Sequence, residues 1–365
     1  MKQLSFASLW AGYTRAQAEA IGFLAEELSF SAFRLAEALQ NISYQKKAVA
    51  KKSGGVRTIY SPNQKLKRVQ EKLNIFFYRW KIDQRQFGCR PEGSPVKNAK
   101  HHVWFTSEES TGRVPRWTLQ LDLKDAFPSV TSDLLREMFL KLILEDSSLD
   151  KQVAEEVATF LVKLTTHNAR LPQGAPTSPY LFNLVLVHSG VIARIAQVCG
   201  KGKKFSIYVD DLTVSSLKKE ITWNFANRLI EAIEEDGWLK VNREKSRRNN
   251  IRCGAHRITG VSLGRVKITS NRRRFKASEV YRYKIALSQK TLNRYRGLIF
   301  RATKIMMSGR LPDQETDGMS LEQILGYIGW IKEAGQEEQK TSPKVSKAIQ
   351  EFFWALELQR STNGP

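Results

Sequence analysis

Two short stretches of the chain combine apolar, β-prone residues with acidic residues. Residues 119–123 alternate up to Asp122, which predicts a strand with Asp122 near its C-terminal end. Residues 205–215 place Asp210 and Asp211 between two short apolar, β-prone runs, and this pattern predicts a strand, a tight turn and a second strand. Asp is also common in ordinary turns, so the dipeptide alone identifies no chemistry.

Helical spacing of apolar residues dominates much of the remaining chain. The predicted helices cover residues 11–40, 63–80, 149–166, 179–198, 221–236, 318–335 and 344–360. A Gly54–Gly55 pair between extended runs predicts a hairpin. Residues 241–246 indicate a polar turn, and residues 258–263 indicate another strand. Helices mixed with hairpins favour the α+β class.

Three positive residues lie on the predicted Gly-Gly hairpin, namely Lys51, Lys52 and Arg57. They could lie over a triphosphate, or they could form an ordinary basic surface. The segment 171–179 combines three prolines with small residues, which predicts a shaped loop with few backbone donors. Such a loop, which contains Gln173 and Gly174, lets a base or sugar approach the backbone closely, but it could equally be a helix-capping turn.

Composition adds an expectation about partners. The chain has 365 residues, of which 41% are hydrophobic, so it can form two or three domains with a sizeable core. Lys and Arg number 59 against 36 Asp and Glu, a net charge of +23. This excess favours binding to a polyanion, first of all a nucleic acid, although a generally basic, solvated surface is the alternative.

The excess of positive charge concentrates in residues 261–310, where Glu279 is the only acid and aromatic residues are interleaved. Cations that meet phosphates and rings that stack on bases suit structured RNA, whereas a solvated helix face is the plainer interpretation. The candidate RNA-binding residues of this region are Arg272, Arg273, Arg274, Lys276, Arg282, Arg294 and Arg296.

Two adjacent carboxylates beside apolar residues cost free energy unless a cation neutralises them. Hard oxygen ligands in small number suit Mg²⁺, which keeps water and substrate phosphates as its other ligands. Asp122 at a strand end and Asp210–Asp211 at a hairpin tip could hold two ions about 3.5–4 Å apart for phosphoryl transfer. The pair His101–His102 lacks a third ligand nearby, which argues against zinc.

Three widely spaced cysteines, Cys89, Cys199 and Cys253, form neither a disulfide framework nor a zinc pattern. No apolar run approaches about 18 residues, and the first residues lack the pattern of a secretory signal. We therefore expect a cytoplasmic protein with no membrane partner.

Five motifs between residues 57 and 263 resemble those of the reverse transcriptase family, both in their residues and in their order along the chain. Tyr208-Val209-Asp210-Asp211 matches the catalytic box, and Leu121-Asp122 with Phe127 matches the motif of the first catalytic carboxylate. Leu171-Pro172-Gln173-Gly174 is similar to the nucleotide-pocket loop. The remaining two motifs are Asn242 with Lys245, and Arg57-Thr58-Ile59 with Pro62, Leu66-Lys67 and Gln70.

Within that family the chain resembles bacterial retron reverse transcriptases. Asn98-Ala99-Lys100-His101-His102 matches the Asn-Ala-x-x-His signature, with His102 in the final place. Ala175-Pro176-Thr177-Ser178-Pro179 matches the bacterial form of the pocket loop. Ile258-Thr259-Gly260 is similar to the Val-Thr-Gly signature, with Ile in place of Val.

The resemblance implies a right-hand polymerase with fingers, a palm of antiparallel sheet and helices, and a helical thumb. We expect an N-terminal helical extension over residues 1–45, fingers and palm over 46–269, and a basic RNA-binding thumb over 270–365. Asp122, Asp210, Asp211 and the Leu123 carbonyl would hold two Mg²⁺ ions, with Mn²⁺ as an alternative. Lys245 would protonate the departing pyrophosphate.

The resemblance also implies roles for the remaining motif residues. Phe127 would exclude a ribose 2′-hydroxyl, while Gln173, Gly174 and Arg57 would bind the dNTP. The signature residues Asn98 and His102 are expected to bind RNA.

A retron enzyme would copy part of its own structured non-coding RNA from an internal 2′-hydroxyl. The product would be a branched RNA–DNA molecule, msDNA, and an effector or toxin protein would act with it in anti-phage defence. Two alternatives stay open: another bacterial reverse transcriptase, of an abortive-infection or group II-like type without a dedicated RNA, and a non-catalytic RNA-binding scaffold.

Overall fold

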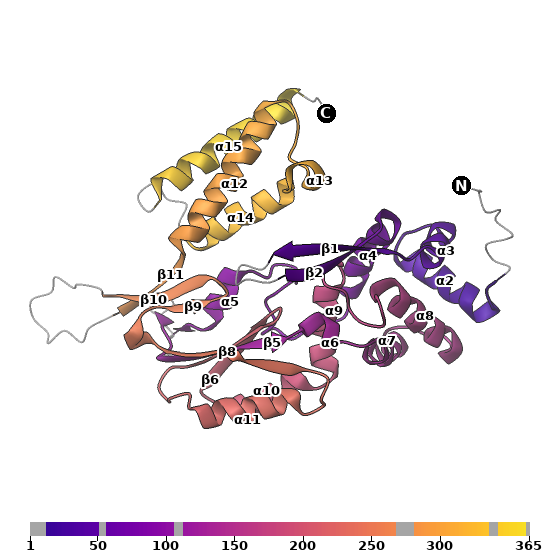
Figure 1. The fold of residues 1–365 in the computed structure, drawn as a ribbon, viewed down its shortest axis with the longest axis horizontal. Helices are drawn as coiled ribbons and strands as arrows, with labels where there is room; N and C mark the ends of the chain where they lie inside the picture. Colours follow the sequence, from indigo (N-terminus) through magenta and orange to yellow (C-terminus); the bar gives the residue numbers. More distant parts are fainter. Residues whose placement is uncertain (1–11, 51–55, 106–111, 268–280, 336–341, 363–365) are drawn as a thin grey trace, which may run out of the picture. The chain divides into compact units, whose positions relative to one another are not determined.

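The structure, a computed structural model, describes residues 12–50, 56–105, 112–267, 281–335 and 342–362 (Figure 1). The chain divides into two compact units, and each is assembled from separate segments. The first unit comprises residues 1–90, 121–200 and 223–245, and the second comprises residues 91–120, 201–222 and 246–365. The expected division into three consecutive domains stays a prediction, and its boundary near residue 270 lies outside the described residues.

Helices make up most of the first unit. They are α2 (Arg15–Glu27), α3 (Ala32–Gln40), α4 (Gln64–Phe77), α6 (Ala126–Ser129), α7 (Ser132–Asp146), α8 (Lys151–Thr165), α9 (Ser178–His188), α10 (Val191–Cys199) and α11 (Trp223–Glu234). Helix α8 packs against α2, α4 and α7. Phe77 stacks on Phe139 with ring centroids 5.6 Å apart, and both rings are fully buried in the core of this unit.

The predicted Gly-Gly hairpin is confirmed on both sides of its tip. Strands β1 (Tyr44–Ala50) and β2 (Val56–Pro62) pair antiparallel, from Tyr44 opposite Pro62 to Ala50 opposite Val56. The tip, with Lys51 and Lys52, lies outside the described residues. Helix α4 begins directly after β2 because the Asn63 side chain accepts a hydrogen bond from the Leu66 amide at 2.9 Å.

The single helix expected over residues 179–198 is wrong. The chain breaks at Ser189–Gly190 into α9 and α10, because Gly190 takes a φ of +77° that an L-residue in a helix does not adopt. No single helix among the described residues is long and apolar enough to cross a membrane. Helices α9 and α10 meet that criterion only as a pair, bent by 63° at the break.

Four strands form the largest sheet, in the order β6-β7-β5-β8. They are β5 (Trp117–Lys124), β6 (Lys203–Tyr208), β7 (Asp211–Ser216) and β8 (Lys240–Asn250). The strand predicted to contain Asp122 is therefore confirmed as β5. The polar turn expected over 241–246 is wrong, because these residues belong to β8, an outer strand whose side chains are mostly exposed. Strands β5 and β8 each run from one unit into the other.

The second unit contains three further sets of elements. These are α5 (Pro95–His101) with β3 (Trp104–Phe105) and β4 (Gly112–Arg113); η1 (Ile251–Cys253), β9 (His256–Ile258), β10 (Val261–Lys267) and β11 (Tyr281–Leu287); and α12 (Gln289–Met307), α13 (Gln314–Asp317), α14 (Leu321–Glu333) and α15 (Pro343–Thr362). Helix α12 packs along α14 and α15 (Figure 1). The three strands β11-β10-β9 form an antiparallel sheet.

One continuous strand over residues 258–263 is not present. Ile258 and Val261 pair across a two-residue turn, Thr259–Gly260, that separates β9 from β10. Both turn residues have positive φ, +46° and +80°, as a type I′ hairpin requires. One apolar core then joins α5, this sheet and the C-terminal helices, through residues such as Val96, Ile258 and Phe352.

Candidate active site

The hairpin of β6 and β7 presents two adjacent carboxylates at its tip, as the sequence predicts. Tyr208 and Asp211 form the last pair of the ladder, and Val209–Asp210 make the turn. Val209 has a φ of +60°, a conformation that strains a β-branched residue and that persists only where its surroundings enforce it. Asp210 is half-buried and Asp211 is exposed. The strained turn Val209–Asp210 thus fixes the backbone that carries the two acidic side chains.

In the first unit, the third expected carboxylate is paired with the expected general acid. Lys245 Nζ on β8 donates to both carboxylate oxygens of Asp122 on β5, at 3.1 and 3.2 Å. The Asp122 side chain is 21% exposed and that of Lys245 is 59% exposed. The next residue, Leu123, is buried. The partly buried Asp122 carboxylate therefore has a positively charged partner on the neighbouring strand.

The donor chemistry of these side chains suits Mg²⁺. Among the described residues, no three His, Cys, Asp or Glu side chains gather into a ready-made metal site. Mg²⁺ is often bound by one or two carboxylates together with substrate phosphates, and does not need an all-protein cage. The adjacent Asp210 and Asp211 of the second unit supply such a pair, and Asp122 of the first unit supplies a further carboxylate with a cation beside it.

The Pro-rich loop at residues 171–177 packs closely on strand β2 of the same unit. The Tyr60 amide donates to the Gln173 carbonyl at 2.7 Å. Gly174 has a φ of +110°, and a Cβ there would lie only 2.3 Å from Ile59 Cγ2. Arg57 is exposed on the same strand, two residues before Ile59. Three of the residues expected to bind a dNTP, Arg57, Gln173 and Gly174, therefore belong to one packed substructure.

The other side of this loop is attached to the segment that follows β5. The Leu171 amide donates to the Val130 carbonyl at 3.2 Å, and Arg170 donates to the Pro128 carbonyl at 2.6 Å. Phe127, in α6, is half-buried and meets Phe182 of α9 edge-to-face with centroids 5.9 Å apart. The expected steric gate thus lies on a short helix whose next residues hold the pocket loop.

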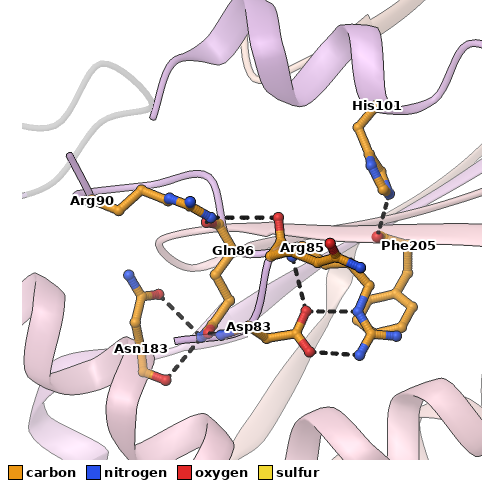
Figure 2. A network of polar contacts seen from close by, with 8 residues as sticks. Asp83, Arg85, Gln86, Arg90, His101, Asn183 and Phe205 are labelled. Carbon is orange, nitrogen blue, oxygen red and sulfur yellow. Dashed lines mark hydrogen bonds and ion pairs between the residues drawn. The ribbon is translucent and has the colours of Figure 1, made fainter. Parts of the chain in front are cut away.

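Helix α9, which follows the loop, is held by a polar network that the sequence analysis did not anticipate. Buried Gln86 donates to the Asn183 carbonyl at 2.9 Å (Figure 2). The Asn183 side chain donates to the Gly88 carbonyl at 2.8 Å. Asp83 and Arg85 form a bidentate ion pair in the same turn. Asn183 is a polar residue within an apolar helix, and that departure from the pattern is the signal by which sequence reasoning could have found it.

The expected RNA contacts of Asn98 and His102 do not fit the structure. Both side chains are 0% exposed, so neither can touch RNA in this conformation. Asn98 Nδ2 donates to Thr259 Oγ1 at 3.3 Å, which links the two signature motifs to each other. The partners of His102 are two serines in β6 and β7. Both signature residues therefore organise the interior of the second unit.

The basic residues expected to bind RNA are described only in part. Arg272, Arg273, Arg274 and Lys276 lie outside the described residues, and Arg282 is described only as a backbone position of β11. On α12, Arg294 is exposed and Arg296 is half-buried. Arg296 lines a surface hollow of about 360 Å³ together with Phe300 of α12 and Lys344 and Lys347 of α15. The 49% exposed Phe300 ring lines it beside these three basic side chains and the acidic Glu351.

Curated relatives are retron enzymes. The chain is 34% identical over 238 residues to "Retron Mx65 reverse transcriptase" of Myxococcus xanthus, which covers 59% of this chain and 50% of that protein. It is 26% identical over 232 residues to "Retron Ec48 reverse transcriptase" of Escherichia coli, covering 63% and 53% respectively. The matching part of the chain thus spans about half the length of these relatives.

Among solved structures, one similar chain is from a telomerase of Candida tropicalis in complex with a fragment of telomeric RNA. It is 14% identical, covers 92% of this chain and 58% of its own, and has a TM-score of 0.46, too low to support an argument. Residues 49–272 match the family described as "Reverse transcriptase (RNA-dependent DNA polymerase)". Because this match spans more than half of the sequence, the chain belongs to the reverse transcriptase family.

Proposed function

We propose that the protein is an RNA-directed DNA polymerase of the retron type. The observation that carries the proposal is the β6–β7 hairpin, whose strained turn presents Asp210 and Asp211 within the part of the chain that matches the reverse transcriptase family. A scaffold that only binds RNA would have no need of adjacent carboxylates on a strained turn.

The proposed reaction joins a nucleotide to a hydroxyl. A primer 3′-hydroxyl, or a 2′-hydroxyl during priming, attacks the α-phosphate of a dNTP; the new O–P bond forms as the bond to pyrophosphate breaks. Asp122, Asp210, Asp211 and the Leu123 carbonyl would hold two Mg²⁺ ions, with Mn²⁺ as an alternative. The ions would supply Lewis acidity to the attacking and leaving oxygens.

The first unit would supply the nucleotide pocket. Phe127 would lie against the deoxyribose, so that a ribose 2′-hydroxyl would clash with its ring. The loop with Gln173 and Gly174 would shape the wall beside it, and Arg57 would pair with the triphosphate. The direct packing of the loop on β2 supports this grouping, because it ties Gln173 and Gly174 to the strand that carries Arg57.

Lys245 is assigned to proton delivery to the departing pyrophosphate. Its ammonium group is bound to Asp122, but its side chain is long and largely exposed. Its length and exposure would allow the ammonium group to leave one anion for another, because water replaces the lost partner at the exposed lysine.

The retron assignment rests on the signatures around Asn98, Thr177 and Thr259 and on the similarity to relatives that are retron reverse transcriptases. It implies a palm with the four-stranded sheet, fingers with the β1–β2 hairpin and a thumb with helices α12 to α15. The thumb would grip a structured non-coding RNA, with Arg294, Arg296 and Phe300 on its surface. The product would be msDNA, made in the cytoplasm and acting with an effector protein in anti-phage defence.

The retron assignment is tested on protein purified from cells that carry the native locus. After removal of protein and treatment with RNase, we expect a short, discrete single-stranded DNA whose mobility changes after debranching. If no DNA accompanies the protein while the same preparation extends a primed RNA template, the retron assignment is wrong and another type of reverse transcriptase takes its place.

Phe127→Ala is expected to reduce the preference for dNTPs over rNTPs by about 10- to 100-fold, because an apolar wall that excludes one group contributes about 1–3 kcal/mol to discrimination. The measurement is kcat/KM for dATP and ATP on one RNA template–primer. The dATP value of the same preparation serves as the internal control for folding. An unchanged ratio would contradict the steric role of Phe127.

A further inference from the structure

The His102 ring lies between the two strands that carry the acidic turn. His102 is the C-cap residue directly after helix α5 and is 0% exposed. Its Nδ1 is 2.6 Å from Ser215 Oγ on β7, and its Nε2 is 2.8 Å from Ser206 Oγ on β6. In the ladder, Ser206 is opposite Thr213 and Ser215 is opposite Lys204, with the pair Phe205–Val214 between them, so the two serines lie diagonally on the same face of the hairpin. One imidazole therefore links β6 to β7.

The ring is neutral in this position. Burial lowers the pKa of His102 well below its ordinary value of 6.5, and the nearby His101, Lys204 and His256 lower it further. A neutral imidazole has one N–H donor and one acceptor nitrogen. One serine hydroxyl must therefore donate to the ring and the other must accept from it, which fixes the orientation of both hydroxyls.

Residues next to His102 bind the same part of β6. His101 Nε2 donates to the Phe205 carbonyl at 3.0 Å (Figure 2). Lys204 Nζ donates to the Val103 carbonyl at 2.8 Å and lies 4.9 Å from the centre of the Trp104 ring. The end of α5 and the residues after it thus hold residues 204–206 through both side chains and backbone.

Helix α5 is itself firmly anchored. At its first turn, Ser94 Oγ donates to Glu333 Oε2 of α14 at 2.6 Å. In its middle, Asn98 bonds to Thr259 in the β9–β10 turn. Its apolar residues Val96 and Ala99 belong to the core shared by the β9–β11 sheet and the C-terminal helices. The helix is therefore a rigid support against which the hairpin can be held.

The bonds of His102 lie close to the carboxylates along both strands. Ser206 comes four residues before Asp210, and Ser215 comes four residues after Asp211. A two-stranded hairpin has little stability of its own, so the position of its tip depends on what holds its strands. We propose that His102 is a positioning residue that fixes the Asp210–Asp211 turn for catalysis, an inference that rests on the proposed polymerase function.

The test uses His102→Phe, which keeps a buried ring but removes both nitrogens. Steady-state extension of an RNA template–primer gives kcat, the dNTP KM and the Mg²⁺ concentration for half-maximal rate. We expect kcat to fall about 10- to 100-fold, as for a misplacement of about 1 Å, with a higher Mg²⁺ requirement and an unchanged dNTP KM. An unchanged kcat, or a loss confined to RNA affinity, would overturn the proposal.

A second variant separates positioning from stability. His102→Phe combined with Ser206→Ala and Ser215→Ala removes both hydroxyls that the loss of the imidazole would leave without a partner. The Tm of this triple variant should therefore return toward that of the wild type. If His102 positions the turn, kcat stays low in this triple variant; if kcat recovers with Tm, the role is merely structural and the proposal fails.

Phe160→Leu, in the buried face of α8 in the first unit, serves as a matched control that lowers Tm without touching the core that supports α5, and it should keep the wild-type kcat. Loss of kcat in this control equal to that of His102→Phe would also overturn the proposal. A wild-type chain without polymerase activity would instead overturn the proposed function.

Discussion

Replacing Asp210 and Asp211 together by Asn is expected to abolish DNA synthesis while the fold persists. Asn keeps the size of the side chain but removes the charge that would hold the metal ions. Loss of metal-assisted charge stabilisation costs several kcal/mol in the transition state, so the rate should fall by at least about a thousandfold. The measurement is incorporation of dNTPs on a primed RNA template at saturating Mg²⁺.

The stability of this double variant should change little, because the two side chains lie at an exposed or half-buried hairpin tip. Substitutions at such positions usually alter the free energy of unfolding by less than about 1 kcal/mol. Asp133→Asn, an exposed acid in the first turn of α7, is the matched control for loss of charge and should retain full activity. Normal synthesis by the double variant would contradict the catalytic role of the hairpin.

Gly174→Ala is expected to impair the nucleotide pocket and the fold together. The added Cβ would meet Ile59 Cγ2 at 2.3 Å and the Tyr60 carbonyl at 3.1 Å, and the φ of +110° disfavours any side chain. The loop must then move off β2 and weaken the bond from the Tyr60 amide to the Gln173 carbonyl. We expect an unfolding free energy lower by about 1–3 kcal/mol and a kcat/KM for dNTPs lower by about 10- to 100-fold.

Gly237→Ala is the matched control for this prediction. Gly237 lies in the same unit with a φ of +75°, but a Cβ added there would have no neighbouring atom within 4 Å. It therefore carries the backbone strain without the clash, and it should lose stability while keeping kcat/KM. Equal kinetic losses in the two variants would show that strain alone, and not the packing of the loop on β2, accounts for the effect.

Local patterns predicted the acidic hairpin and the strand of Asp122. The strand of Asp122 shows a clear alternation of apolar and polar residues, and in the hairpin two β-prone apolar runs flank the acidic pair within a few residues. Polar edge strands gave no such signal. The polar sequence of residues 241–246 favours a turn. An exposed outer strand such as β8 needs few apolar residues and therefore shows little alternation. Its strand conformation depends on neighbours that are distant in sequence, chiefly β5.

The roles of Asn98 and His102 could not be predicted from sequence patterns, because their hydrogen-bond partners are also distant in the sequence. The serines that bind His102 are 104 and 113 residues away, and the threonine that binds Asn98 is 161 residues away. A polar signature shows that certain residues matter, but it does not distinguish an RNA contact from a buried hydrogen bond. Serines at inward positions of the apolar strands β6 and β7 were the available clue.

The packing of the pocket loop on β2 could be predicted only in part. The motifs placed Gln173, Gly174 and Arg57 in one function, and the structure joins them in one substructure. The close approach of Gly174 to Ile59 has no signature in the sequence, because glycine in a Pro-rich loop is explained equally well by the turn itself.

The most direct test of the central claim is DNA synthesis by the purified wild-type chain on its co-purified RNA, or on a primed RNA, with labelled dNTPs and Mg²⁺. We expect a DNA product that is complementary to the RNA, depends on the divalent ion and is absent with Asp210→Asn/Asp211→Asn. Failure of the wild-type chain to make DNA on either RNA, or equal synthesis by the double variant, would contradict the proposed polymerase function.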